Sequence, residues 1–273
     1  MLVETEWKGQ CDVLRDFVFA KASMSILARG FRQGVPDENL MENLDETHFC
    51  VNMDNGRTLS FRGDEQISYA DVVSGSICIR MVVKVTRGPA ARICRPFMIF
   101  KKHDSTYAIR AVTDTVPGVC YMTTTSSFMT TKCLAEYYRE RRVSVAAPGE
   151  RRLVQWIDNY PGHNITPEIS AALERINTEI RYLPSNSTHL TRPADSFIIS
   201  KIKDTWIRRW ELKKAEMIAQ GLWQGDGRSG SSGMLKNPQN PYFLALAAES
   251  IAEVNAAPYR DGISYARKAM IRT

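Results

Sequence analysis

The sequence predicts a mixed α/β fold, in which one sheet carries helices on its faces. The first half of the chain contains strand-like runs around a hairpin signal, and the second half alternates short apolar strands with helices. This order favours a mixed sheet over a sandwich or a bundle. The composition, 44% apolar and 24% charged, is that of a globular protein and excludes collagen-like, coiled-coil and wholly disordered classes.

The first half of the chain is expected to form one helix and then several strands. Apolar residues recur at helical spacing over residues 12–33. A strand is expected over residues 44–53, and the Asp54-Asn55-Gly56 sequence after it is a strong hairpin signal. Further strands, rich in Ile, Val and Met, are expected over residues 77–86, 93–101 and 119–124.

From residue 129 onward, helices alternate with short strands. Thr166, Pro167 and Glu168 form a typical helix start, because Thr caps the first turn, Pro fits it and an acid favours the helix dipole. The elements expected here are a helix over 129–142, a strand over 153–157, a helix over 166–179, a strand over 180–183 and a long helix from about Ala194.

The last part of the chain differs in composition. Residues 221–239 are rich in glycine and serine, which is typical of a flexible linker. Two short helices are expected after it, over 241–256 and 263–271, as a small helical C-terminal appendage. The expected division is an N-terminal helical linker over 1–35, a main domain over 40–220, a flexible linker over 221–240 and a short helical tail over 241–273.

Charge and cysteine content bear on the partner and the compartment. The net charge of +6 favours a polyanionic partner such as nucleic acid. Six cysteines without a CxxC pair, and a first segment without the apolar run of an export signal, predict reduced thiols in a protein that is not secreted. The four histidines have no zinc-ligand spacing, and no apolar run approaches the roughly 20 residues of a membrane span.

Three aspartates stand at the starts or ends of expected elements. Asp45 lies in or at the head of the first strand, and Asp195 lies in the first turn of the long helix. Asp158 directly follows the strand over 153–157, at its carboxyl end. On a helical wheel Asp195 shares a side with the apolar stripe, so we expect it to point toward the sheet. The stripe consists of Ile199, Ile202, Trp206 and Trp210.

Three carboxylates over one end of a sheet suit two hard divalent cations. Mg²⁺ prefers oxygen ligands, and a pair of ions can activate a water on one side and stabilise a leaving oxygen on the other. The alternative is structural. A chain with 30 acidic residues places some of them at element ends by chance, and Asp at a helix start usually serves as a cap.

The sequences around these aspartates resemble the three catalytic blocks of the DDE superfamily endonucleases of the pogo, Tigger and jerky type. Asp45-Glu46-Thr47 resembles the first block. The segment VQWIDNYPGH, residues 154–163, resembles the second, an apolar strand that ends in Asp-Asn with a later His. The segment LPSNSTHLTRPAD, residues 183–195, is similar to the third. The resemblance covers about residues 40–215.

The resemblance implies an RNase H-like fold in which three acids bind two Mg²⁺ or Mn²⁺ ions, and water or a 3′-hydroxyl attacks a DNA phosphodiester. On this chain the implied catalytic and metal-binding acids are Asp45, Asp158 and Asp195. Asp54 is a rival for the first acid, but the Asp-Asn-Gly turn accounts for it. Glu46, next to Asp45 in the strand, is expected to face the opposite way.

Two residues of the second block are implied to support the site, and one residue of the third block departs from the pattern. Asn159 either orients Asp158 or a metal-bound water, or is a turn residue. His163 is either part of the catalytic machinery or caps a loop. Arg192 stands where relatives usually have Gln, and a cation there either binds DNA phosphate or repels metal.

Basic residues near the expected site are candidates for contacts to the DNA backbone. They are Arg192, Lys201, Lys203, Arg151 and Arg152. The alternative is that these charges form an ordinary solvated face.

The resemblance therefore implies a transposon-derived, metal-dependent endonuclease or transposase domain, which we expect in the nucleus, or in the cytoplasm before import. We expect DNA as its partner, with self-association as a further option, and neither a membrane nor an organic cofactor. The alternative is a catalytically inert, domesticated or relic domain that binds nucleic acid. Only 44 residues precede Asp45, so we expect no room for the helix-turn-helix modules of related transposases.

Overall fold

The computed structural model describes residues 37–50, 78–101, 116–140, 151–183, 193–222, 235–260 and 262–272. The helix expected over 12–33, the hairpin at Asp54-Asn55-Gly56 and most of the third block, including Arg192, lie outside these residues. The linker expected over 221–239 is described at its two ends.

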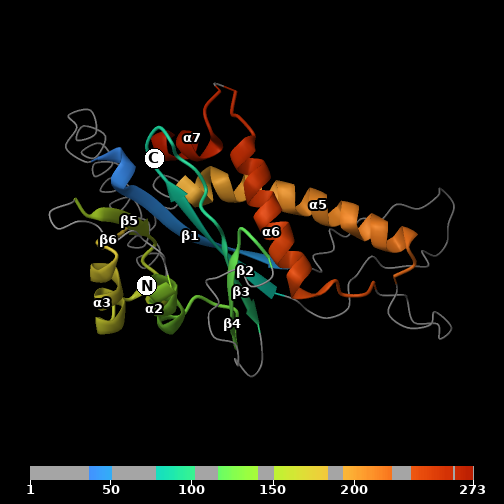
Figure 1. The fold of residues 1–273 in the computed structure, drawn as a ribbon, viewed down its shortest axis with the longest axis horizontal. Coiled ribbons are helices and arrows are strands. Elements are labelled where there is room, and N and C mark those ends of the chain that lie inside the picture. Colours follow the sequence, from blue (N-terminus) through green and yellow to red (C-terminus); the bar gives the residue numbers. More distant parts are fainter. Residues whose placement is uncertain are drawn as a thin grey trace, which may run out of the picture.

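One mixed sheet is built from the strands in the described residues, which are β1 (Met41–Cys50), β2 (Cys78–Thr86), β3 (Phe97–Lys101), β4 (Cys120–Thr124), β5 (Leu153–Ile157) and β6 (Thr178–Tyr182). Their order in the sheet is β4-β3-β2-β1-β5-β6 (Figure 1). β1 is central and pairs antiparallel with β2 and parallel with β5. β2 and β3 are antiparallel, whereas β3–β4 and β5–β6 are parallel.

Strand alternation distributes the apolar side chains of the sheet over both of its faces. In β2, Met81 and Val83 lie in one hydrophobic core and Val82 lies in the other. All three side chains are at most 1% exposed. A sheet that is apolar on both faces needs a helical layer on each of them.

Helices cover both faces. The face of Val82 carries α2 (Thr131–Glu140) and α3 (Pro167–Arg175), which pack through residues such as Leu134 and Ile169. The other face carries the π-helical turn η3 (Ala194–Ile198) and the helices α5 (Ile199–Ala219), α6 (Gln239–Ala256) and α7 (Tyr265–Arg272). Two 3-10 turns, η1 (Glu38–Leu40) and η2 (Pro161–His163), complete the described elements.

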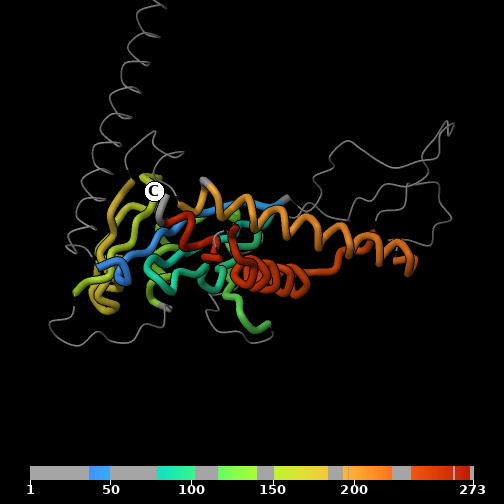
Figure 2. Tube along the Cα trace, turned by 90° about the horizontal axis from the view of Figure 1, so that it is seen from above, coloured from blue at the N-terminus to red at the C-terminus, as the bar shows by residue number. Residues whose placement is uncertain are grey.

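The larger core lies between the sheet and α5, α6 and α7. Trp206 of α5 stacks on Phe49 of β1, with ring centroids 4.2 Å apart, and on Phe243 of α6, at 6.3 Å. α6 packs against α5, as both views show (Figures 1 and 2). The helices expected as a small C-terminal appendage are therefore present, and they share this core with α5 and the sheet. The domain boundaries given above stay predictions.

The end of α3 differs from the prediction. The helix expected to run to residue 179 ends at Arg175, and β6 already begins at Thr178. Asn177, between them, has φ of 45°, the left-handed conformation that ends helices and that Asn tolerates better than most residues. The start of α3 is as predicted, because Thr166 Oγ1 accepts a hydrogen bond from Ile169 N at 3.3 Å.

The prediction of a mixed α/β sheet with flanking helices is confirmed. Among the described helices, none is long and apolar enough to cross a membrane. Cys94, Cys120 and Cys133 are thiols in the structure, and the side chains of the other three cysteines lie outside the described part.

Candidate functional site

Asp45 lies in the middle of β1, on the strand face that carries the larger core. Alternation gives Asp45 the same face as Asn43 and Phe49, and Phe49 belongs to that core. Asp45 is 8% exposed, and its Oδ1 accepts a hydrogen bond from Glu46 N at 2.8 Å. Because β1 is the central strand, Asp45 has a fixed position relative to both neighbouring strands.

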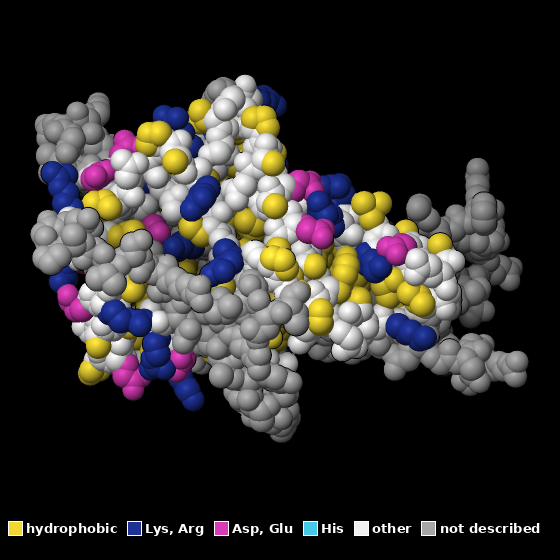
Figure 3. All heavy atoms as spheres, viewed as in Figure 1, with side chains coloured by type: hydrophobic (Ala, Val, Ile, Leu, Met, Phe, Trp, Pro, Cys, Tyr) yellow, Lys and Arg dark blue, Asp and Glu magenta, His cyan; other side chains and the backbone are white. Residues whose placement is uncertain are grey.

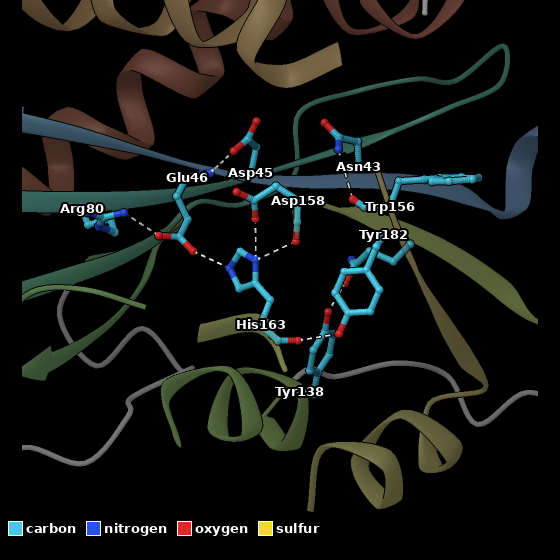
Figure 4. A network of polar contacts seen from close by, with 10 residues as sticks. Asn43, Asp45, Glu46, Arg80, Tyr138, Trp156, Asp158, His163 and Tyr182 are labelled. Carbon is cyan, nitrogen blue, oxygen red and sulfur yellow. Dashed lines mark hydrogen bonds and ion pairs between the residues drawn. The ribbon is translucent and has the colours of Figure 1, made fainter. Parts of the chain in front are cut away.

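Asp158 follows the end of β5, level with Asp45 on the neighbouring strand. β1 and β5 run parallel, and Asn43 pairs with Trp156. Asp45 lies two residues after Asn43, and Asp158 lies two residues after Trp156. Figure 4 shows both side chains in this region, and the side chain of Asp158 is 20% exposed. The fold therefore brings Asp45 and Asp158 to one part of the sheet.

The third predicted acid, Asp195, lies in η3 at the start of the long helix. The backbone N–H of Ala194 donates to Asn43 Oδ1 at 3.1 Å, which fastens this helix start to β1. Ala194 is fully buried, whereas Asp195 is exposed. The segment that carries the third acid is thus held to β1 at Asn43, which is two residues before Asp45.

The prediction that Asp195 points toward the sheet is wrong. Ala194 takes the inward position, and the next residue of a helix points roughly 100° away. The helical wheel also assumed a regular α-helix, but η3 is a π-turn in which Ile199 N donates to Ala194 O. The apolar stripe itself is as predicted, because Ile199, Ile202 and Trp206 are buried.

The imidazole of His163 lies between Glu46 and Asp158 (Figure 4). Its Nε2 is 2.7 Å from Glu46 Oε1, and its Nδ1 is 2.5 Å from Asp158 Oδ1 and 3.2 Å from the Asp158 backbone oxygen. Arg80 Nη1 donates to the other carboxylate oxygen of Glu46 at 2.7 Å. These four side chains form a continuous chain of charge-assisted contacts from β2 to the segment after β5.

Glu46 faces away from Asp45, as expected from strand alternation. Figure 4 shows the two carboxylates on opposite sides of β1. Strand alternation does not fix the direction of the Asp158 side chain, because Asp158 follows the end of β5. This side chain contacts His163 on the same side of the sheet as Glu46. The turn η2 that carries His163 is held by Tyr182 of β6, whose Oη donates to His163 O at 2.8 Å.

The pKa of His163 is raised to about 10. Burial alone lowers the pKa of an imidazole, but here the hydrogen bonds and negative charges of Asp158 and Glu46 outweigh burial. At neutral pH the ring is therefore an imidazolium that donates a hydrogen bond from each nitrogen. The imidazolium contacts the carboxylate of Asp158 on the face of the sheet that α2 covers.

Residues 91–225 match the family described as DDE superfamily endonuclease. The protein has a DDE superfamily endonuclease domain. The matched segment includes Asp158 and Asp195, and Asp45 precedes it. No curated protein matches the chain.

Solved structures of Mos1 transposase are similar to this chain. A Mos1 transposase paired-end complex with left transposon end is 13% identical, with a TM-score of 0.42 over 88% of this chain and 60% of that chain. The Mos1 mariner paired-end complex with Mn is 13% identical, with a TM-score of 0.41 and the same coverage of 88% and 60%. The catalytic domain of Mos1 mariner transposase is 12% identical, with a TM-score of 0.39 over 88% of this chain and 89% of that chain. This chain thus spans 60% of the transposase chain in the two complexes.

The basic residues suggested for DNA contact differ in their surroundings within the DDE domain. Arg151 is exposed and Lys203 is half-buried. Arg152 pairs with Glu174 at 2.6 Å, and Lys201 pairs with Asp204 at 3.4 Å. Their role in binding DNA stays a prediction, as does the supporting role of Asn159, which is exposed.

Further basic side chains of α5 are paired with acids. Arg209 contacts Glu253 and Glu249 of α6 at 2.9 and 2.5 Å, and Lys213 contacts Glu216 at 3.0 Å. Figure 3 shows Lys and Arg side chains interspersed with acidic and apolar ones on the face in view. This face of the protein therefore shows mixed charge, which lowers its attraction for a polyanion.

The structure brings the three predicted metal ligands together only in part. In the part of the chain that the structure describes, no three His, Cys, Asp or Glu side chains form a group that could hold a metal ion. Asp45 and Asp158 are brought to one region, and the exposed Asp195 lies on the element fastened beside them. All three predicted ligands are carboxylates, which is the ligand chemistry that Mg²⁺ and Mn²⁺ prefer.

Sequence reasoning missed two features of this region. Glu46 was expected only to face away from Asp45, whereas it joins His163 to Arg80. Asn43 was not singled out, although its buried amide contacts both β5 and η3. A signal for Asn43 was present, since an amide two residues before Asp45 lies on the same face of a strand.

Proposed function

We propose that the DDE domain is the catalytic domain of a metal-dependent DNA endonuclease or transposase, in which Asp45, Asp158 and Asp195 hold two Mg²⁺ or Mn²⁺ ions. One observation carries the proposal. Asn43 of β1 pairs with Trp156 of the parallel strand β5, and Asp45 and Asp158 lie two residues after these partners. Asn43 also accepts a hydrogen bond from the backbone N–H of Ala194, next to Asp195.

Three carboxylates on separate elements are suited to phosphodiester chemistry. When bound, two divalent ions would activate a water or a 3′-hydroxyl and stabilise the leaving oxygen. The protein's own contribution would be to fix the carboxylates. Asp45 is fixed by the central strand, and Asp158 is fixed by the imidazolium of His163. The exposure of Asp195 would let it approach a substrate at the surface.

A second candidate is the inert domain that binds nucleic acid without cutting it. It is favoured by the exposure of Asp195 and by the absence of a group of three metal-binding side chains in the described residues. In both candidates we propose DNA as the partner and the nucleus as the compartment, because the net charge of +6 favours a polyanion.

Plasmid nicking by the purified protein in Mg²⁺ and in Mn²⁺ tests the proposal. We expect nicking that needs the metal and that falls at least 100-fold in Asp45→Asn, Asp158→Asn and Asp195→Asn, because each ion loses a charged ligand. Asp204→Asn is the matched control, since Asp204 is an exposed acid on the same helical segment as Asp195.

Each outcome separates the two candidates. Nicking that survives all three substitutions would contradict the metal site. Binding of DNA by wild-type protein, without nicking and without thermal stabilisation by Mn²⁺, would favour the inert domain.

A further inference from the structure

Asn43 makes two hydrogen bonds to backbone groups on two other elements. It lies in β1 and is 1% exposed. Its Nδ2 donates to Trp156 O of β5 at 3.1 Å, and its Oδ1 accepts from Ala194 N of η3 at 3.1 Å. Both polar atoms of a buried amide are therefore used, and each fixes a main chain instead of another side chain.

The two partners of Asn43 lie next to the proposed metal ligands. Trp156 is two residues before Asp158, and Ala194 is one residue before Asp195. Asn43 itself is two residues before Asp45. One amide thus connects the three segments that carry the three acids.

Other contacts also hold these segments, since His163 links Asp158 to Glu46 of β1 and η3 packs in the core, but Asn43 lies where the strand pairing ends. The described pairing of β1 with β5 comprises three residue pairs and ends at Asn43 and Trp156, just before the acids. The first N–H groups of a helix need partners from outside the helix, and Pro193 provides no side-chain cap for η3. Asn43 provides such a partner from a strand 151 residues away in sequence.

We propose that Asn43 is a positioning residue for the metal site, and that its amide sets the spacing of Asp45, Asp158 and Asp195. This inference rests on the proposed function. Mg²⁺ requires nearly ideal octahedral geometry, so small shifts among three ligands on three elements reduce its affinity. Loss of residues that orient metal ligands typically weakens metal binding by about 10- to 100-fold.

The chain offers a matched control in Asn255 of α6. Its Nδ2 donates to Ile93 O at 2.8 Å and its Oδ1 accepts from Ile93 N at 2.9 Å. Asn255 therefore also uses both amide atoms on backbone groups, but it joins α6 to the segment before β3. Asn43→Ala and Asn255→Ala remove the same kind and number of hydrogen bonds, and they differ in whether the acids are nearby.

Three measurements on the full chain test the inference. Denaturant unfolding in EDTA gives the loss of stability of each variant. Thermal stabilisation by Mn²⁺, titrated in each variant, gives the metal midpoint. Hydrogen exchange of the peptide around residues 194–199 reports the Ala194 amide without metal. We expect both variants to lose stability, but only Asn43→Ala to shift the Mn²⁺ midpoint upward, by about 10-fold or more, and to speed exchange around Ala194.

The outcomes separate this inference from the proposed function. An Asn43→Ala protein with lowered stability and an unchanged Mn²⁺ midpoint would overturn the positioning role and leave the metal site standing. A wild-type protein that Mn²⁺ neither stabilises nor activates would overturn both. If Asn43→Ala does not fold, Asn43→Ser, which keeps a polar group, undergoes the same three measurements with Asn255→Ser as its control.

Discussion

Glu46 Oε1 lies 2.7 Å from His163 Nε2, although the two residues are 117 positions apart in sequence. The contact joins the central strand to the turn after β5. It also connects Asp158, which binds the other ring nitrogen, to Arg80 on β2. An acid that points away from the first aspartate thereby helps to fix the second.

Replacing Glu46 tests this chain of contacts. Glu46→Gln keeps the size of the side chain but removes its charge, so the contacts to Arg80 and His163 weaken. We expect the free energy of unfolding to fall by about 1–3 kcal/mol, because hydrogen bonds to charged groups are lost at a buried position. Denaturant unfolding measures this change.

The control for Glu46 is Glu179→Gln. Glu179 pairs with Arg181 at the surface, where the two side chains are 42% and 46% exposed. The expected cost there is under about 1 kcal/mol, since exposed ion pairs contribute little. NMR titration of wild-type protein and Glu46→Gln adds a direct readout, in which the pKa of His163 falls below about 10. Equal costs at the two positions would contradict the prediction.

The stability contributed by His163 should depend on pH. Its pKa is raised in the folded protein to about 10 from an ordinary value of 6.5. A raised pKa stabilises the fold fully below pH 6.5, and this stabilisation is lost as pH rises toward 10. We therefore expect the difference in unfolding free energy between wild type and His163→Gln to be largest at pH 6 to 6.5, at about 1.5–3 kcal/mol, and to shrink as pH rises toward 10.

Unfolding of both proteins in EDTA, at several pH values between 6 and 10, measures this difference. His48→Gln is the control, because His48 is exposed on the same strand as Glu46. A difference that grows with pH would show that the neutral ring is the stabilising form.

Phe243 tests how firmly α6 belongs to the core. It is 0% exposed and lies against Trp206 and Trp210 of α5. We expect Phe243→Ala to lower the free energy of unfolding of the whole domain by about 3–5 kcal/mol, because it leaves a cavity in the shared core. Leu212→Ala, at a position on α5 that is 63% exposed, should change it by less than about 0.5 kcal/mol. If a separate transition for α6 appeared, with the remaining transition unchanged, residues 241–273 would be an independent tail.

The thiol of Cys133 should resist alkylation in the folded protein. Burial raises the pKa of Cys133 to about 12, and the residue is 1% exposed. The reactive thiolate is therefore scarce at pH 8, and the reagent cannot reach it. We expect iodoacetamide at pH 8 to modify the half-buried Cys94 before Cys133, as judged by peptide mass spectrometry, and urea to abolish the difference. Equal modification in the native state would contradict this.

Local patterns predicted most of the elements. The strand Leu153–Ile157 has the predicted bounds, because a Pro-Gly sequence, a signal for a turn, precedes it and a charged residue follows it. The start of α3 was equally clear from Thr166 and Pro167. Its end was not, because the helix already stops at Arg175, before Asn177 with its φ of 45°, and β6 begins at Thr178.

The site was less accessible to sequence reasoning. The three acids were found through short motifs, but the orientation of Asp195 depends on a π-turn that a helical wheel does not represent. The contacts of Asn43 and Glu46 join residues more than 100 positions apart, so they depend on how strands and turns meet in three dimensions. The local pattern in β1 places Asn43 on the strand face of Asp45, but it does not show which distant groups Asn43 and Glu46 contact.

The π-turn η3 both anchors a short segment in the core and presents an acidic side chain to solvent. Ala194 and Ile198 anchor the segment in the core, while Asp195 between them is exposed. The wider turn accommodates the acid without shifting the buried stripe of α5 that follows it. A change of the acid at this position should therefore cost the fold little, so that selection on this side chain and selection on the fold can act independently.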